Sequence, residues 1–363
     1  MTTTRLVHDA EGRNTAVWPI EADQTITPVE AFFTRSHAAA PEIDPDAWRL
    51  EIGGLVDRPL VLSLADLAAL PHVEVAATLV CAGMRRAEYL ALGPLPGELP
   101  WGPEPASTGV WRGVPLRTVL DAAGVGTGAR HIEFVGLDSV ERDGQTFGFG
   151  GSIDLTKALS GEVLLATGLN GAPIPRAHGY PVRAVVPGWI GARSVKWVGR
   201  VTLSAEPSPN YFQRKAYRVQ RERTPDDPRD VSAGEALSRI AVNSVIVAPS
   251  PGQVVPAGRI RVRGWAIGTE GQPLAGVEVS PNACDGWVSA RLGPGASRWT
   301  WSLWEAELDL PPGEHTIAVR ATDVTGGMQP ETVTETWNVK GYANNAWHRV
   351  TVTSEAWRPS LAP

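Results

Sequence analysis

The stretch from Val73 to Arg86, VEVAATLVCAGMRR, constrains the fold of this chain more than any other. Its first eight residues are mostly apolar, which predicts a buried strand, and Ala82-Gly83 interrupts that pattern. The strand would therefore end at a lone thiol, Cys81, beside two arginines. Cationic neighbours and turn amides lower the pKa of a thiol and favour the thiolate, which acts as a nucleophile or a metal ligand. A cysteine at a strand end is more often a small buried apolar residue, so this stretch alone leaves both interpretations open.

Composition predicts a strand-rich protein with two domains. The chain has 363 residues, which is long for one domain, and 43% of them are hydrophobic, enough for proper cores. Its 38 glycines and 31 prolines indicate many turns rather than long helices. A net charge of -6 argues against a nucleic-acid partner, so any anion site must be a local cluster of arginines.

Sulfur is scarce in the sequence. Two cysteines, Cys81 and Cys284, are too few for a disulfide framework, a four-cysteine zinc site or an iron–sulfur cluster supplied by this chain alone. Because no CxxCH motif occurs either, we expect no haem and no iron–sulfur cluster, and we interpret Cys284 as a structural or surface residue. The start of the sequence carries no secretion signal and no 18-residue apolar run follows, so we expect a cytoplasmic protein with no membrane partner, or a periplasmic one if a signal peptide was removed.

Patterns along the chain predict an α+β fold with two parts. We place a mixed α/β domain at residues 1–235, including an N-terminal arm and a linker from about residue 204, because residues 204–236 are rich in Pro, Arg and Asp without periodicity. An all-β, immunoglobulin-like sandwich is expected at 236–363, where short alternating stretches recur between turns.

Local signals place several elements of the first domain. Ser63 is a typical helix N-cap before apolar residues at helical spacing, and Gly124 is a typical helix end for the stretch from Leu116. His131 begins an alternating stretch that predicts a strand ending at Asp138.

Basic residues gather in predicted loops of the first domain. An isolated arginine is usually a solvated surface residue, but turns rich in Gly or Pro offer amides to oxyanions, and guanidinium groups bind phosphate or sulfate bidentately. The stretch from His178 to Lys196 is therefore a candidate site for a phosphate-bearing cofactor near Cys81. The basic blocks are Arg35 to His37, Arg85 with Arg86, His178 with Arg183, and Arg193 with Lys196.

Seven motifs follow one another from about Ala31 to about Val352, namely FFTRSHAAAP, CAGMRR, STGVWRGVPL, FVGLDS, PIPRAHGYPVRAVVPGWIGARSVKWVGRV, YFQRKAY and NNAWHRV. In this order they resemble the signatures of the sulfite oxidase family of molybdenum enzymes. The resemblance implies a molybdopterin-binding catalytic domain followed by the sandwich as a dimerisation domain. It also implies that Cys81 is the protein's sulfur ligand to molybdenum, whose other sulfurs come from the dithiolene of a pyranopterin. A soft thiolate suits such a metal.

The same resemblance assigns residues to the cofactor and to the substrate. The residues implied to contact the pterin or its phosphate are Phe33, Thr34, Arg35, Ser36, His37, Asp138, His178, Arg183, Ser194, Val195 and Lys196. Those implied to form an oxyanion pocket before the metal are Arg35, Arg86, Tyr217 and, from the second domain, Arg349, with Trp101 as a wall. Three arginines and a phenol would bind a small dianion.

The sequence departs from the family pattern at the edge of this pocket. Met84 stands where the CAGNRR form has Asn, Ser36 replaces the Asn of the RNH form, and the run Gly97 to Pro100 lacks a frequent Lys. These changes leave the identity of the oxyanion open.

The function that the resemblance favours is oxidation of sulfite to sulfate by oxygen-atom transfer, with electrons passed to a separate acceptor such as a cytochrome, another redox protein or oxygen. We expect a homodimer formed mainly through the second domain. The alternatives are reduction of nitrate or an S-oxide at the same site, and a non-catalytic protein that binds the molybdenum cofactor.

Overall fold

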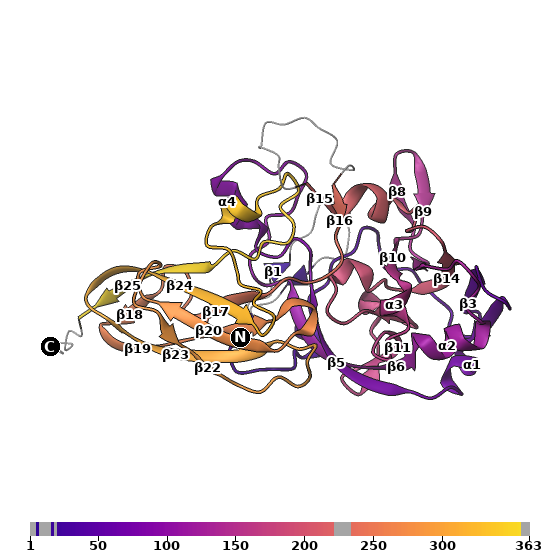
Figure 1. Ribbon diagram of the computed structural model, residues 1–363, viewed down its shortest axis with the longest axis horizontal. Coiled ribbons are helices and arrows are strands. Elements are labelled where there is room, and N and C mark those ends of the chain that lie inside the picture. Colours follow the sequence, from indigo (N-terminus) through magenta and orange to yellow (C-terminus); the bar gives the residue numbers. More distant parts are fainter. Residues whose placement is uncertain (1–4, 7–15, 18–19, 221–233, 357–363) are drawn as a thin grey trace. The chain divides into compact units, whose positions relative to one another are not determined.

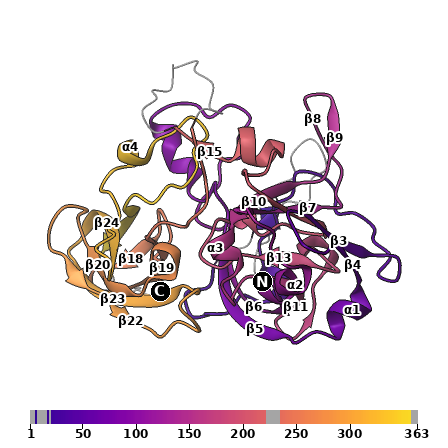
Figure 2. The ribbon, with the colours of Figure 1, turned by 45° about the vertical axis from the view of Figure 1, so that its right-hand side comes forward.

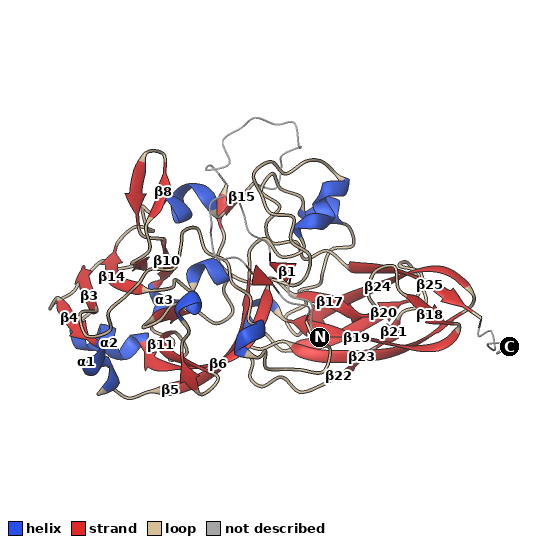
Figure 3. Cartoon of the chain, turned by 180° about the vertical axis from the view of Figure 1, so that it is seen from behind, coloured by secondary structure: helices blue, strands red, loops and turns tan. Residues whose placement is uncertain are grey.

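The computed structural model describes residues 5–6, 16–17, 20–220 and 234–356 of the chain. The described chain is mostly strand and loop, with few and short helices (Figure 3). It divides into two compact units. The first contains Met1–Pro19, Ile26–Arg239 and Asn338–Tyr342, and the second contains Ile20–Thr25, Ile240–Trp337 and Ala343–Pro363.

The first unit is built on two main sheets (Figures 1 and 2). One has the order β10-β7-β14-β3-β4, with strands Gly150–Asp154, His131–Gly136, Val198–Ser204, Arg49–Gly54 and Leu60–Ser63. Only β14 and β3 pair in parallel within this sheet. The other has the order β12-β11-β6-β5, with β13 also paired to β11, and its strands are Ala172–Pro173, Leu164–Leu169, Ala106–Pro115, Val73–Val80 and Arg183–Val185.

Short elements complete this unit. The small strands are β1 (Arg5–Leu6), β2 (Ala16–Val17), β8 (Val140–Arg142), β9 (Gln145–Phe147), β15 (Arg218–Val219) and β16 (Glu235–Ala236). The helices are α1 (Leu64–Ala68), α2 (Leu116–Ala123), α3 (Leu155–Ala158), the 3-10 turns η1 (Val29–Ala31), η2 (Arg86–Ala91), η3 (Arg176–His178) and η4 (Gly191–Arg193), and the π-turn η5 (Phe212–Ala216).

The local signals in the sequence place these helices correctly. Ser63 caps α1 in a capping box with Asp66, whose backbone N–H donates to the Ser63 hydroxyl oxygen over 3.1 Å. α2 buries one apolar face, including Leu116 and Leu120, and ends at Gly124, whose φ of 71° suits glycine. The hydrophobic core of the first unit therefore consists of alternate strand residues and of the apolar face of α2.

The second unit is a two-sheet sandwich, as the sequence predicts. One sheet has the order β17-β19-β23-β22 and the other β18-β25-β24-β20-β21. Alternate side chains of the long strands, such as Val262 and Val319, form its core. Its elements are β17 (Asn243–Ala248), β18 (Val254–Pro256), β19 (Gly258–Ile267), η7 (Thr269–Gly271), β20 (Leu274–Ser280), β21 (Val288–Ser289), β22 (Arg291–Leu292), β23 (Ser302–Leu310), β24 (Gly313–Asp323), α4 (Val333–Thr336) and β25 (His348–Glu355).

The segment expected to be a linker is partly packed in the first unit. Phe212 and Tyr217 are buried there, and β15 pairs with β16. Residues 221–233, also within the expected linker, lie outside the described residues. Within the described ranges, no helix is long and apolar enough to cross a membrane.

Candidate active site

Cys81 lies at the end of β5 in a tight turn. Its backbone N–H donates to the Pro105 carbonyl over 2.9 Å, and its carbonyl accepts a 3.0 Å hydrogen bond from the N–H of Met84. Arg85 has a φ of 62°, so the chain reverses directly after the cysteine. The half-buried Cys81 lines two pockets, both made by residues of the first unit.

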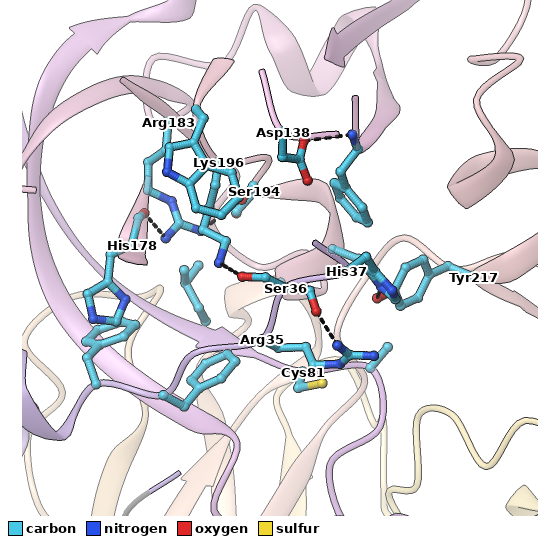
Figure 4. A pocket seen from close by; sticks show the side chains of 18 residues that line it. Arg35, Ser36, His37, Cys81, Asp138, His178, Arg183, Ser194, Lys196 and Tyr217 are labelled. Atoms are coloured by element: carbon cyan, nitrogen blue, oxygen red, sulfur yellow. Dashed lines mark hydrogen bonds between the residues drawn. The ribbon is translucent and has the colours of Figure 1, made fainter. Parts of the chain in front are cut away.

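The first pocket has most of the residues that the resemblance implies for the cofactor in its wall (Figure 4). Thr34 and Val195 are buried beside it without lining it. The implied residues that do line it are Phe33, Arg35, Ser36, His37, Asp138, His178, Arg183, Ser194 and Lys196. They come from loops, a 3-10 turn and strand β13, which are far apart in the sequence and meet in the folded unit.

Two cations line this cavity, the buried Arg183 and the half-buried Lys196. The Nζ atom of Lys196 donates to the Ser36 hydroxyl over 2.5 Å and to the Ala177 carbonyl over 3.1 Å. The guanidinium of Arg183 donates to the carbonyls of His178 and Ser194, each over 2.8 Å. Burial lowers the pKa of Arg183 to about 9, and burial with repulsion from Arg183 lowers the pKa of Lys196 well below its ordinary value.

The other titratable groups nearby respond to the same field. Burial, followed by the charges of Lys196 and Arg183, lowers the pKa of His178 to about 3, so its imidazole is neutral. Burial raises the pKa of Asp138, whose Oδ1 accepts a 2.9 Å hydrogen bond from the N–H of Phe149. A buried site in which cations repel one another is stabilised by an added anion, so the cavity fits a cofactor that carries a phosphate.

The second pocket is also lined by Cys81 and contains every implied substrate residue of the first unit. Arg35, Arg86, Trp101 and Tyr217 all line it, and the same wall includes Glu98, Lys340 and Tyr342. Arg35 lines both pockets, as does Tyr217. A group held at Cys81 would therefore adjoin both the cofactor cavity and a basic pocket.

Arg86 organises the second pocket through four directed contacts. Its Nε donates to the carbonyls of Lys340 and Gly341, over 2.9 and 3.3 Å. Its Nη1 donates to the Leu99 carbonyl over 3.1 Å, and its Nη2 lies 3.2 Å from a carboxylate oxygen of Glu98. The guanidinium carbon also lies 5.0 Å from the centre of the Tyr342 ring.

Two glycines make room for this arginine. A Cβ atom at Gly83 or at Gly341 would lie 2.7 Å from the Arg86 side chain, too close for any larger residue. Gly341 also has a φ of 57°, which disfavours other residues. The segment Asn338–Tyr342 can therefore approach Arg86 this closely because Gly341 has no side chain.

Tyr217 is a neutral hydrogen-bonding group between the two pockets. Its hydroxyl lies 2.8 Å from Nε2 of His37, and its ring stacks on Tyr342 with centres 5.4 Å apart. Burial raises the pKa of Tyr217 well above its ordinary value, so the phenol keeps its proton. It can therefore donate to an oxyanion over the whole working pH range.

Arg349 belongs to the second unit, on β25. Its guanidinium donates to the Glu331 carbonyl over 2.8 Å and lies 5.4 Å from the centre of the Trp347 ring. Its contribution to the pocket stays a prediction.

Sequence reasoning missed Lys340, Tyr342 and the role of Glu98. The sequence places Glu98 in a region, with Met84, that bears on the choice of oxyanion, but it does not predict the partners of Glu98, and no local pattern marks the segment around Lys340 as part of a site. The available signal was the small and basic composition of Val339-Lys340-Gly341 between two buried aromatic residues, Trp337 and Tyr342. Within the described residues, no group of three or more His, Cys, Asp or Glu could hold a metal ion.

Two family models match successive parts of the chain. Residues 37–212 match the oxidoreductase molybdopterin binding domain, and residues 235–355 match the Mo-co oxidoreductase dimerisation domain. Both matches are to families of molybdenum-cofactor oxidoreductases.

Individual relatives are similar over most of the chain. Sulfite oxidase of Gallus gallus is 40% identical over 339 residues, covering 90% of this chain and 73% of that protein. Sulfite oxidase of Arabidopsis thaliana is 34% identical, covering 90% of this chain and 87% of that one. Mitochondrial sulfite oxidase of Homo sapiens is 38% identical over 90% of this chain, which spans 61% of the human protein.

A solved structure is also similar. The crystal structure of the sulfane dehydrogenase SoxCD from Paracoccus pantotrophus superposes with a TM-score of 0.81 at 26% identity. The match covers 97% of this chain and 88% of that chain. Its similarity therefore extends over both domains.

Proposed function

Since the chain belongs to the sulfite oxidase family of molybdenum-cofactor oxidoreductases, we propose that it oxidises sulfite to sulfate and passes the electrons to a separate acceptor. The observation that carries this proposal is the position of Cys81 between two pockets. One pocket presents buried cations to a cofactor, and the other presents Arg35, Arg86 and Lys340 to a small anion.

The residues around the first pocket suit a pyranopterin with a phosphate. Cys81 would hold the molybdenum through its thiolate, and Arg183 with Lys196 would bind the phosphate. When bound, the molybdenum cofactor supplies oxygen-atom transfer and two-electron redox chemistry. His178 and Asp138 would add hydrogen bonds at the wall of the cavity, where both are buried.

The chain's own part in the reaction is to bind and orient the oxyanion. Arg35 and Lys340 supply positive charge, and Arg86 adds the N–H groups that its backbone contacts leave available. Tyr217 donates a hydrogen bond without adding charge. Trp101 is buried and forms a rigid wall that limits water.

The assembly and location that go with this function are also proposals. The match of residues 235–355 to a dimerisation domain supports a homodimer. Sedimentation of the purified protein at micromolar concentration tests it, and a monomer would contradict it. The electron acceptor is a separate redox partner, and a cytoplasmic location stays a prediction.

The test of the function is purification with metal and pterin analysis, followed by a dye-coupled assay. The loaded protein is offered sulfite, nitrate or a sulfoxide, with an electron-accepting dye for the first and an electron-donating dye for the others. We expect turnover with sulfite. Turnover only with nitrate or sulfoxide would replace the proposal by reduction at the same site, and a fully loaded protein inactive with all three would favour a cofactor-binding role.

A further inference from the structure

The second pocket, which Cys81 lines, contains a carboxylate. A pocket that binds an anion would be expected to have none. Glu98 is the one acidic residue among the described residues that line this pocket. Its two carboxylate oxygens lie 3.2 Å from Nη2 of Arg86 and 3.1 Å from Nζ of Lys340. These are two of the cations that the proposed function assigns to the substrate.

The local structure holds this carboxylate in place. The backbone N–H of Glu98 donates to the Leu95 carbonyl over 3.2 Å. Its neighbour Leu99 accepts a hydrogen bond from Arg86, and the carbonyl of Lys340 accepts another from the same guanidinium. Glu98 and Lys340 are therefore both bound to Arg86, whose side chain is 4% exposed.

The energetic consequence depends on the charge of the guest. A bound anion is attracted by Arg35, Arg86 and Lys340 and repelled by Glu98. The repulsion is proportional to the guest's charge, so it is twice as large in energy for a dianion as for a monoanion in the same place. Because the Glu98 side chain is only 17% exposed, water screens this repulsion less than it would at the surface.

We propose that Glu98 is a specificity-determining residue, which weakens the pocket's electrostatic preference for dianions and so favours singly charged sulfur oxyanions, such as hydrogensulfite, relative to a pocket without this carboxylate. The inference rests on the proposed function in one respect, namely that the pocket in front of Cys81 receives the oxyanion. Glu98 also offers an acceptor to a proton on the guest, which a hydrogensulfite carries and a sulfite does not.

The test compares two inert tetrahedral anions, sulfate as the dianion and methanesulfonate as the monoanion. Their dissociation constants are measured by calorimetry on the loaded holoenzyme at constant ionic strength. Glu98→Gln keeps the shape and an acceptor oxygen while it removes the charge. We expect it to tighten sulfate about tenfold and methanesulfonate only about threefold, because the monoanion feels half the repulsive energy.

Two further variants separate charge from structure. Glu98→Asp retains the charge and should retain the wild-type ratio of the two constants. Asp121→Asn removes a carboxylate from an exposed ion pair with Arg117 on α2, outside both pockets, and should change neither constant. Molybdenum content and thermal melting establish that each variant is loaded and folded.

The proposal is overturned if Glu98→Gln changes both constants by the same factor, changes neither, or is matched by Glu98→Asp. Each of these results would make Glu98 a structural tie for Arg86 rather than a discriminator of charge. Failure of the proposed function is recognisable separately: the loaded enzyme would not turn over sulfite, although the charge preference for the inert anions would still shift in Glu98→Gln.

Discussion

The Nε atom of Arg86 donates a 2.9 Å hydrogen bond to the backbone carbonyl of Lys340, 254 positions further along the chain. This contact brings the segment Asn338–Tyr342 to the loop that follows Cys81. It places the Lys340 amine and the Tyr342 ring in the wall of the pocket. The pocket is therefore completed by a part of the chain that follows most of the sandwich domain.

Replacement of Cys81 by serine should abolish activity and lower molybdenum content, while the fold survives. A hydroxyl is a harder and poorer ligand than a thiolate for a metal bound by sulfur. Metal analysis, a turnover assay and circular dichroism measure the three quantities. Full turnover with molybdenum at wild-type occupancy would contradict the assignment of Cys81 as the ligand.

Lys340→Met should raise KM for sulfite by one to two decades. Loss of one charge-assisted contact costs about 1.5–3 kcal/mol, and pterin and molybdenum content should stay unchanged. Lys215→Met is the matched control. Lys215 also lines the pocket and, like Lys340, pairs with a carboxylate, but its side chain is 44% exposed against 33% for Lys340, so water screens its charge more and the rise in KM should be smaller.

Arg349→Met tests the sequence-based assignment of a pocket residue in the second domain. We expect it to raise KM less than Lys340→Met does. The guanidinium of Arg349 is engaged by the Glu331 carbonyl and the Trp347 ring, whereas Lys340 lines the pocket directly. Steady-state kinetics measure KM for sulfite in both variants. A larger rise in KM for Arg349→Met would make Arg349, rather than Lys340, the main cation that binds the substrate.

Tyr217→Phe should lower kcat/KM by one to two decades, since a hydrogen bond to a charged group contributes about 1.5–3 kcal/mol. The pKa of Tyr217 is raised by burial, so the wild-type rate should show no loss from ionisation of this phenol as the pH approaches 10. The pH profiles of the two proteins check both statements. A wild-type rate that falls near pH 10, with no such fall in Tyr217→Phe, would show an ordinary pKa.

The cofactor-free protein should lose stability in acid because of His178. Its pKa is about 3 when folded and 6.5 when unfolded, so its stabilising contribution is complete above pH 6.5 and is lost as the pH falls toward 3. At pH 5 the free energy of unfolding should be about 2 kcal/mol lower from this group alone. Urea unfolding at pH 7 and pH 5 measures the difference.

His178→Gln should reduce that difference between the two pH values. His315→Gln, at an exposed site in the sandwich, should leave it unchanged. An equal pH dependence in His178→Gln and the wild type would show that His178 titrates normally in the folded protein.

The sequence by itself determined the local elements and the chemistry of the first pocket. The apolar run of β5 before Cys81, the Ser63 cap and the Gly124 stop depend on residues within a few positions of one another, so periodicity and capping rules suffice to predict them. Motif resemblance added the residues from Arg35 to Lys196, because those motifs keep their order and their residue types.

Only the tertiary structure decided which distant residues share the second pocket. The parallel pairing of β14 with β3 joins strands about 150 residues apart, and the bond from Arg86 to Lys340 spans a still longer distance. No local period encodes such pairings, because they depend on which surfaces of the folded sheets can pack together. For the same reason, the sequence does not predict that the Glu98 carboxylate pairs with Arg86 and Lys340, and only the folded structure shows these contacts.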